Sequence, residues 1–343
     1  MLVAQQSALV EPMAKQRFTA ITAASIEPGL VPFNLYTKGD DGRATLYLRK
    51  GLIYTPKRKG ILKELERVFY ITSDDKDRYL EYASDRIENI VNNPEIRVSD
   101  KAMIVYGVGK RTVKRLMEDP RSGSVMNSSR RLVESQVALI FSSPEAAANM
   151  FELSAFDSYT FSHSINVCTF CIMLGEKLFG DDKQKLWELG MSGLLHDVGK
   201  SRIDQNILEK ETCLDAEEWE VMKRHTLFSY EIIREHSLPK PIADAGRHHH
   251  ERLDGSGYPD GLKGWRIHPT ARIVSVADIY DALTSDRPYK SKMTPLEALH
   301  EIAATEPHID QGAFNALLQS VLRNMDLVHD FQANKLAGSF HPA

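Results

Sequence analysis

From Ser143 onward, the apolar residues of this chain recur with the 3.6-residue period of an amphipathic α-helix. Asp215 and Glu218 stand at the capping-box spacing that begins a helix. Helices are predicted over residues 145–153, 157–180, 182–196, 215–236, 239–251, 268–285, 294–304 and 310–325. The C-terminal half is therefore expected to be almost entirely helical.

The N-terminal part of the chain has a different pattern. β-Branched and aromatic residues form short runs that are typical of strands, and turn residues separate several of them. Strands are predicted over residues 18–21, 31–36, 44–49 and 68–71, and a short helix over residues 62–67. After Thr72 the pattern becomes helical, with Ser73 as a capping residue.

These patterns divide the 343 residues into four parts and predict a mainly α protein. Residues 1–73 are expected to form a small α+β domain whose role the sequence leaves open, regulation being one option, and residues 74–143 a helical connector. Residues 144–330 are expected to form an all-helical bundle domain, followed by a tail over residues 331–343. The connector would carry a homodimer interface or relay an input; alternatively, its helices pack against their own domain.

The composition of the chain predicts which partners are not expected and in which compartment the protein acts. The formal net charge of −4 predicts no non-specific binding to nucleic acid, so DNA is not an expected partner. No window holds the roughly 20 apolar residues that span a bilayer, and the first residues do not resemble a secretory signal. Three cysteines do not make a disulfide framework, which favours a reducing cytoplasm.

Residues 248–250 are three consecutive histidines, followed by Glu251 and by a loop over residues 254–259 with two glycines and a proline. Neutral imidazole is the commonest nitrogen ligand of transition metals. Adjacent histidines supply two ligands to one site only where the backbone is irregular or at a helix end. The loop contains the residue types that build such a turn. The pattern favours a metal site, and a solvated helix end is the alternative.

A second signal is the pair His196-Asp197 at the end of a predicted apolar helix. Gly199 permits a turn there, and Lys200 follows. A buried imidazole beside a buried carboxylate is costly unless the two are paired or bind a metal. The second oxygen of such a carboxylate can bridge to another metal. The alternative is a simple hydrogen bond within the pair, with the lysine in solvent.

Further candidate ligands lie on three other predicted helices. Asp278 and Asp281 stand three residues apart, hence on one helix face, where one suits a ligand and the other an orienting or substrate-binding acid. His163 lies early in a long apolar helix, and His225 lies on the apolar face of its helix. Each histidine alone is more often a satisfied core residue. Together the candidates are numerous enough for two metals.

The ordered set of candidate ligands resembles the HD superfamily of metal-dependent phosphohydrolases. The residues that carry this resemblance are His163, His196-Asp197 and Asp278. Further residues make the chain similar to the HD-GYP family, the cyclic di-GMP phosphodiesterases of bacterial signalling. These are His225, His249, His250 and Gly257-Tyr258-Pro259. The resemblance spans roughly residues 150–330, and as an ordered set it is far more specific than a His-Asp pair alone.

The resemblance implies a dinuclear metal site. One metal would be held by His163, His196, Asp197 and Asp278, and the second by Asp197 as a bridge with His225, His249 and His250. His248 has no matching ligand role. Some family members carry a glutamate that supports a third metal, four residues before the equivalent of His163. Tyr159 stands there in this chain, which predicts two metals.

The resemblance also implies catalytic and substrate-binding residues. Asp197 and Lys200 are the catalytic residues, and Lys200 would bind a phosphate oxygen. The residues implied to bind substrate are Asp157, Lys200, Tyr258, Asp281, Arg287 and Lys290. Tyr258 would stack on a base or bond through its hydroxyl. For Asp281, the alternative is a role in orienting a metal ligand.

The implied reaction is hydrolysis of cyclic di-GMP to linear pGpG and on to GMP. Two metals ~3.5–4 Å apart lower the pKa of a bridging water and hold a phosphodiester for in-line attack. The family favours iron or manganese, and such a site also suits nickel, cobalt or zinc. GGDEF-domain proteins are implied partners of the Gly257-Tyr258-Pro259 loop. The alternatives are a cyclic-dinucleotide receptor with little turnover and a hydrolase of cyclic GMP-AMP.

Overall fold

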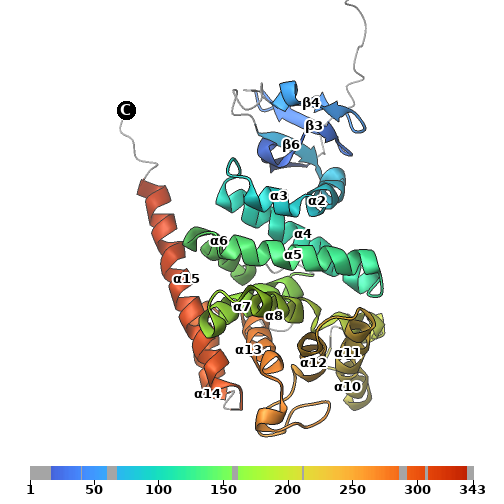
Figure 1. Cartoon of the computed structure of the whole chain (residues 1–343), viewed down its shortest axis with the longest axis vertical. Coiled ribbons are helices and arrows are strands. Elements are labelled where there is room, and N and C mark those ends of the chain that lie inside the picture. Colours follow the sequence, from blue (N-terminus) through green and yellow to red (C-terminus); the bar gives the residue numbers. More distant parts are fainter. Residues whose placement is uncertain are drawn as a thin grey trace, which may run out of the picture. The chain divides into compact units, whose positions relative to one another are not determined.

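The computed structural model describes residues 17–39, 41–59, 68–156, 161–210, 212–285, 292–305 and 308–337. The chain forms two compact units, of which one ends at Ala83 and the other begins at Ser84. A small antiparallel sheet lies in the first unit and the second is built from helices, which confirms the predicted mainly α fold (Figure 1).

The first unit contains a four-stranded antiparallel sheet in the order β1-β6-β3-β4. Its strands are β1 (Phe18–Ile21), β3 (Leu35–Lys38), β4 (Ala44–Leu48) and β6 (Phe69–Thr72), and a separate pair joins β2 (Gly29–Leu30) to β5 (Ile53–Tyr54). Strands β1, β4 and β6 agree with the predicted ranges to within one residue. The strand predicted over residues 31–36 begins only at Leu35. Pro32 lies in the missing part, and proline has no amide hydrogen for a sheet ladder.

Aromatic side chains form the core of this unit. Phe33 and Phe69 are fully buried, and Phe33 packs edge-on against Tyr79 and Tyr82 of α2 (Lys76–Ser84), with ring centroids 5.6 and 5.5 Å away. Burial of each such ring stabilises the fold by about 1.5–3 kcal/mol. Short helices of this unit include η1 (Ala23–Ser25) and η2 (Ser73–Asp75). The helix predicted over residues 62–67 lies outside the described residues.

The second unit begins with α3 (Ile87–Asn92), α4 (Val98–Glu118) and α5 (Gly123–Ile140). These helices fall in the range predicted as a connector. Helix α4 packs against α6 (Pro144–Phe156), and α5 packs against α8 (Lys183–Leu195). They therefore belong to the same compact unit as the helices that follow them.

The remaining helices are α7 (His163–Phe179), η3 (Val198–Arg202), α9 (Gln205–Leu208), α10 (Ala216–Lys223), α11 (His225–Glu235), α12 (Lys240–His248), η4 (Gly264–Arg266), α13 (Pro269–Thr284), α14 (Pro295–Thr305) and α15 (Gln311–Ala337). Several differ from their predicted ranges: α7 begins at His163 where residue 157 was predicted, and α12 ends at His248 where residue 251 was predicted. The helix predicted over residues 215–236 is broken at Arg224, and the last helix continues to Ala337, into the predicted tail. The capping box of Asp215 and Glu218 is confirmed.

Helices α7 and α8 lie at the centre of this unit, with α13 and α15 packed against α7 and α5 and α12 against α8 (Figure 1). Gly193 of α8 faces the backbone of α7, where an added Cβ would lie 2.9 Å from the Cα atom of Cys168. Only glycine permits this approach. The crossing brings the end of α8 beside the start of α7. Among the helices that the structure describes, none combines the length and apolarity that a bilayer crossing requires.

Candidate metal centre

Six of the seven predicted metal ligands lie at four helix ends, and the seventh, Asp278, lies within α13. His163 and His225 are the first residues of α7 and α11, and His196 and His249 follow the last residues of α8 and α12. At a helix end the backbone leaves its regular path. Asp197 beside His196, and His250 beside His249, can therefore face the same site as their neighbours, which regular helix geometry would prevent.

Two groups of donors result. The first contains His163, His196 and Asp278, whose ligand atoms all lie within 4.8 Å of one another. The Nε2 atom of His163 is 3.2 Å from Nε2 of His196 and 3.3 Å from Oδ1 of Asp278. The second group contains Asp197, His225, His249 and His250, with ligand atoms within the same limit of 4.8 Å.

Asp197 lies between the two groups and presents one carboxylate oxygen to each. Its Oδ2 atom is 3.4 Å from Nε2 of His163 and 3.3 Å from Nε2 of His196. Its Oδ1 atom is 3.2 Å from Nε2 of His225 and 3.8 Å from Nε2 of His249. A carboxylate in this position has the geometry of a bridge between two cations.

Backbone carbonyls orient three of the imidazoles. The Nδ1 atom of His196 is 2.8 Å from the carbonyl oxygen of Gly193, and that of His225 is 2.7 Å from the carbonyl oxygen of Met222. The Nδ1 atom of His249 is 3.1 Å from a carbonyl oxygen of its own helix. A carbonyl only accepts hydrogen bonds, so each Nδ1 carries the proton. Each neutral ring then directs an unprotonated Nε2 inward, as metal-binding histidines do.

The inward-facing atoms fit a cation. Two nitrogen lone pairs that face each other across 3.2 or 3.4 Å, as in the pairs His163–His196 and His225–His249, repel unless a cation or a proton lies near them. The Oδ1 atom of Asp197 is buried and accepts no hydrogen bond from the residues that the structure describes. Such an orphaned buried oxygen is costly without a ligand. The donor set therefore fits divalent metal.

The carboxylates are held in the charged form that a metal requires. Burial alone would raise the pKa of Asp197, but Lys200 and His196 outweigh burial and hold this pKa well below its ordinary value. Burial also opposes ionisation of Asp278, and the neighbouring His163 outweighs it, so that this pKa is likewise well below its ordinary value.

Burial lowers the pKa of three imidazoles. The pKa of His225 is lowered, that of His249 lies well below the ordinary value, and that of His250 falls to about 3. These rings are therefore neutral near pH 7 and available to a metal. At His163 burial acts in the same direction, but the surrounding carboxylates outweigh it and raise the pKa.

Lys200 lies at the edge of the centre, on η3. Its Nζ atom donates to Oδ2 of Asp197 over 2.5 Å, and one third of its side chain is exposed. A cation in this position can meet a negatively charged group that approaches Asp197 from solvent.

Glu251 holds the glycine-rich loop against the centre. This residue is buried, and its carboxylate accepts hydrogen bonds from the backbone N–H groups of Asp260, at 2.7 Å, and Leu262, at 3.0 Å. Gly257 sits so close to the chain that an added Cβ would lie 2.4 Å from the Cα atom of Glu251. The loop is therefore fixed by one buried carboxylate and by one position that only glycine fits.

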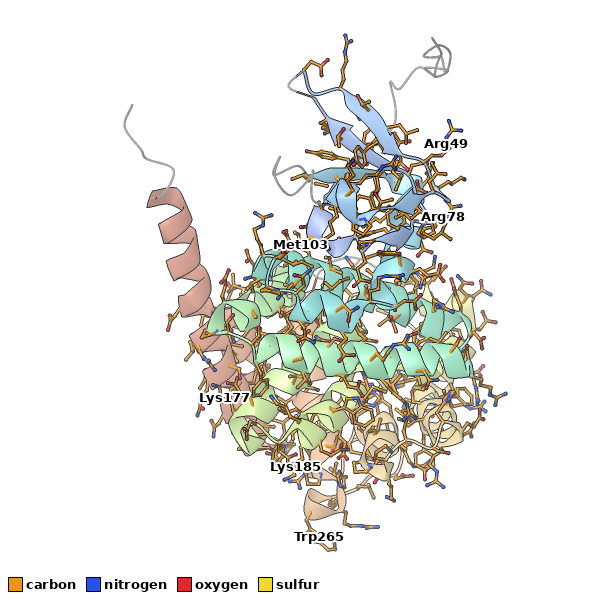
Figure 2. All side chains as sticks on the ribbon, turned by 45° about the horizontal axis from the view of Figure 1, so that its top comes forward. Arg49, Arg78, Met103, Lys177, Lys185 and Trp265 are labelled. Atoms are coloured by element: carbon orange, nitrogen blue, oxygen red, sulfur yellow. The ribbon has the colours of Figure 1, made fainter. Side chains whose placement is uncertain are left out.

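Two aromatic side chains, Tyr258 and Trp219, lie beside the donor group that contains His250. The ring of Tyr258 lies over that of His250, with centroids 4.8 Å apart and planes inclined by 30°. Trp219 of α10 meets Tyr258 edge-on at 6.0 Å and is partly exposed. Trp265 of η4 is 88% exposed and projects from the molecule (Figure 2). We call Tyr258 and Trp219 the aromatic wall.

Other predicted residues lie elsewhere. His248 joins neither group: its Nε2 atom is 2.9 Å from Oδ2 of Asp260. Asp281 is fully buried, with Oδ2 2.7 Å from Nδ1 of His163 and Oδ1 bonded to the amide of Asn166 at 2.9 Å. Both oxygens are engaged inside the protein. This position fits the orienting role considered for Asp281 and does not fit a substrate contact.

Asp157, Tyr159, Arg287 and Lys290 lie outside the described residues. Sequence reasoning gave no role to Asn166, Glu251 or Trp219. Asn166 had a usable signal, because it is a polar residue three positions after His163 in an otherwise apolar helix. The positions of Glu251 and Trp219 depend on the path of the loop, which no local pattern reveals.

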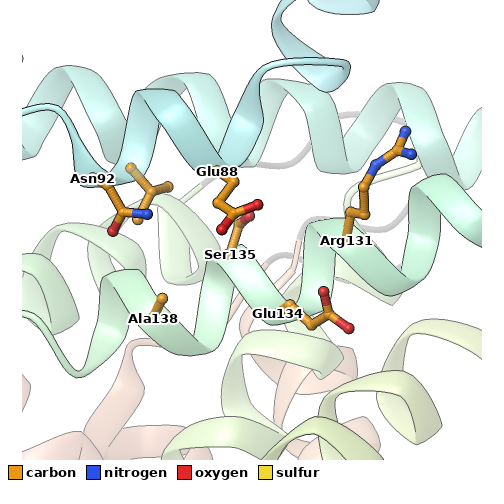
Figure 3. Close-up of a pocket in the computed structure, with 7 residues that line it drawn as sticks. Glu88, Asn92, Arg131, Glu134, Ser135 and Ala138 are labelled. Atoms are coloured by element: carbon orange, nitrogen blue, oxygen red, sulfur yellow. The ribbon is translucent and has the colours of Figure 1, made fainter.

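A separate hollow of about 170 Å³ lies between α3 and α5 (Figure 3). Its lining residues are Glu88, Val91, Asn92, Arg131, Glu134, Ser135 and Ala138. The guanidinium of Arg131 lies 3.9 Å from the carboxylate of Asp85. The hollow contains no member of either donor group and does not belong to the metal centre.

A sequence model of the HD domain family matches residues 131–312, more than half of the chain. The chain belongs to this family, as the ordered ligand set predicted. Its fold resembles the solved structure of Bd1817, an HDG"Y"P protein from Bdellovibrio bacteriovorus. The TM-score is 0.61, the match covers 88% of this chain and 98% of that one, and the sequences are 22% identical. At this identity the likeness shows the fold alone.

Two curated relatives are more similar in sequence. The chain is 34% identical over 223 residues to cyclic di-GMP phosphodiesterase PA4108 of Pseudomonas aeruginosa, a match that covers 64% of this chain and 54% of that protein. It is 36% identical over 165 residues to 3'3'-cGAMP-specific phosphodiesterase 3 of Vibrio cholerae, covering 48% of this chain and 35% of that protein. The chain thus spans about half the length, or less, of these relatives.

Proposed function

We propose that this chain is a metal-dependent phosphodiesterase that hydrolyses cyclic di-GMP to linear pGpG and then to GMP. The observation that carries the proposal is the position of Asp197, which has one oxygen toward each of two histidine groups. The similarity to a cyclic di-GMP phosphodiesterase of Pseudomonas aeruginosa supports this substrate. Two divalent ions would polarise the phosphodiester and lower the pKa of the attacking water.

The ligand assignment follows the two donor groups. One metal would be held by His163, His196, Asp278 and Oδ2 of Asp197, and the other by His225, His249, His250 and Oδ1 of Asp197. We assign two metals to each chain. Iron or manganese is proposed, and nickel, cobalt and zinc suit the same imidazole and carboxylate donors.

Substrate would bind between Lys200 and the aromatic wall. Lys200 is proposed to hold a non-bridging phosphate oxygen, because its charge lies beside Asp197 and its side chain reaches solvent. Tyr258 and Trp219 are proposed to stack on a base, an interaction worth about 1–3 kcal/mol per base. Asp157, Arg287 and Lys290 remain proposed contacts of guanine or phosphate.

The test begins with protein purified under anaerobic conditions. Its metals are identified and counted, and it is incubated with cyclic di-GMP in the presence of Fe(II) or Mn(II) while products are separated by chromatography. The expected products are pGpG and GMP. An absence of turnover with either metal would overturn the proposal, and tight binding without hydrolysis would favour a receptor.

Cyclic GMP-AMP is the second candidate substrate. The observation in its favour is the 36% identity to 3'3'-cGAMP-specific phosphodiesterase 3 of Vibrio cholerae. Because the two dinucleotides share a phosphodiester ring and differ in one base, kinetics on both in parallel would distinguish them. We expect the higher kcat/KM for cyclic di-GMP.

The proposal also includes a protein partner, an oligomeric state and a cellular location. The loop at Gly257-Tyr258-Pro259 is the proposed contact for GGDEF-domain proteins, and the chain is proposed to act in the cytoplasm as a homodimer. Light scattering on the purified protein tests the dimer. Binding of a purified GGDEF domain, lost when Tyr258 is replaced by alanine, tests the contact.

A further inference from the structure

A buried chain of hydrogen bonds joins helix α4 to the candidate ligand His163. The hydroxyl of Tyr106, on α4, donates to Oδ1 of Asn166 at 2.6 Å. The Nδ2 atom of Asn166 donates to Oδ1 of Asp281 at 2.9 Å, and Oδ2 of Asp281 is 2.7 Å from Nδ1 of His163. Tyr106 is 3% exposed, and Asn166 and Asp281 are fully buried.

The direction of each bond follows from the chemistry of the groups. A carboxylate accepts hydrogen bonds, so Asp281 turns the amide nitrogen of Asn166 toward itself and requires a proton on Nδ1 of His163. The amide oxygen of Asn166 is then left to accept from Tyr106. With Nδ1 engaged by Asp281, Nε2 is the ring nitrogen of His163 that faces the metal centre. Tyr106 therefore stands at one end of a chain that orients a ligand at the other.

His163 is anchored differently from the other imidazoles. His196 and His225 are held by backbone carbonyls three residues before them, which belong to α8 and α10. His163 is held by a side chain of α13, which is held in turn by α7 and α4. Close packing keeps α4 in place: an added Cβ at Gly109 would lie 2.6 Å from the side chain of Ile165, next to Asn166.

We propose that Tyr106 and Asn166 are positioning residues for the first donor group, and that they couple helix α4 to its metal affinity. Tyr106 lies outside residues 131–312, which match the HD domain family, so this contribution comes from a part of the chain that precedes the family match. The inference rests on the metal-binding part of the proposed function and does not depend on the substrate.

The test measures metal affinity in the absence of substrate. Metal-free protein is titrated with Co(II), whose visible absorption reports its ligands, and bound metal is counted after dialysis. The variant Tyr106→Phe removes one hydroxyl and keeps the ring. The matched control is Tyr280→Phe, because the Tyr280 hydroxyl is equally buried but has no hydrogen-bond partner among the described residues.

Tyr106→Phe is expected to weaken one of two Co(II) sites about 10-fold, the low end of the effect of residues that orient a metal ligand. The other site should keep its affinity, since its histidines make no bond to this chain of residues. Tyr280→Phe should bind Co(II) as the unaltered protein does. Unchanged affinity at both sites in Tyr106→Phe would overturn the inference, as would an equal loss in Tyr280→Phe.

A second variant keeps the inference testable if Tyr106→Phe unfolds. Asn166→Ala breaks the chain at its centre and should weaken the same Co(II) site. Where both variants fold, their effects on Co(II) affinity should not add in the double variant, because either change alone removes the hydrogen bond between Tyr106 and Asn166. Additive effects would contradict the coupling. The two proposals can fail separately. Selective loss of one Co(II) site in Tyr106→Phe, together with no hydrolysis of cyclic di-GMP by the unaltered metal-loaded protein, would support this inference and reject the proposed function.

Discussion

Gly199 lies directly against the backbone of His225: a Cβ atom added to Gly199 would be 2.0 Å from the carbonyl oxygen of His225. The amide of Gly199 also donates to the hydroxyl of Ser229 at 2.8 Å. This contact holds η3 against α11 two residues after Asp197. It therefore sets how closely Asp197 approaches His225, and with it the spacing of the two donor groups.

Replacement Gly199→Ala should disrupt the metal centre. The added methyl group meets backbone, which cannot rotate away, so we expect a loss of about 3 kcal/mol or more in the free energy of unfolding. Gly123→Ala is the control, because an added Cβ at Gly123 meets nothing within 4 Å. Urea unfolding and metal content are the measurements. Full stability with two bound metals in Gly199→Ala would contradict the role of this contact.

Replacement Asp197→Ala should abolish hydrolysis and leave the helical fold intact. One side chain then disappears from both donor groups, so metal content should fall at both sites. Asp326→Ala, an exposed carboxylate on α15, should change neither property. Circular dichroism and metal analysis check the outcome. Retained activity with only one metal lost would show that Asp197 is not a bridge.

Replacement Asp281→Asn separates the two roles considered for Asp281. If this carboxylate orients His163, metal affinity at the first group should fall about 10- to 100-fold. Asp244→Asn is the control, since Asp244 is also buried but pairs with Lys240. Unchanged metal affinity with a raised KM for cyclic di-GMP would instead identify Asp281 as a substrate contact.

Metal removal should lower thermal stability. A metal at 100 times its Kd stabilises the folded state by about 2.7 kcal/mol per site, because only the folded chain brings the donors together. Chelator-treated protein should therefore unfold at a lower temperature, and added Mn(II) should restore the original value. Asp197→Ala should show no such shift. A shift of equal size in that variant would indicate that Mn(II) binds elsewhere.

The stability of the metal-free protein should depend on pH through His250. Burial lowers the pKa of this ring from 6.5 to about 3. Below pH 6.5 the unfolded chain therefore binds a proton that the folded chain does not, and stability is lost as the pH falls. Relative to chelator-treated His250→Phe, the free energy of unfolding of chelator-treated protein should fall by up to about 1.4 kcal/mol per pH unit as the pH is lowered from 6.5 to 5. Urea unfolding at each pH measures the free energy of unfolding of both proteins. The same dependence on pH in the two proteins would contradict the prediction.

Local patterns predicted most of the fold. The 3.6-residue period placed α8 and α13 to within two residues at each end, because helices bury one apolar stripe wherever they pack. The same period missed the break at Arg224, which separates α10 from α11. Apolar residues continue across that break, so the period alone does not reveal it. The contact between Gly199 and His225 lies beside it and joins residues that are distant along the chain.

The sequence by itself determined which side chains are candidate donors and which helices carry them, since spacing and residue type are local properties. The resemblance already implied how the donors divide into two groups, and the tertiary structure has the same division, with one oxygen of Asp197 toward each group. Only the tertiary structure turned Asp281 toward His163, 118 positions away, and joined this pair to Tyr106 on α4. Such contacts depend on how helices cross, and helix crossings are set by packing among side chains far apart in the sequence.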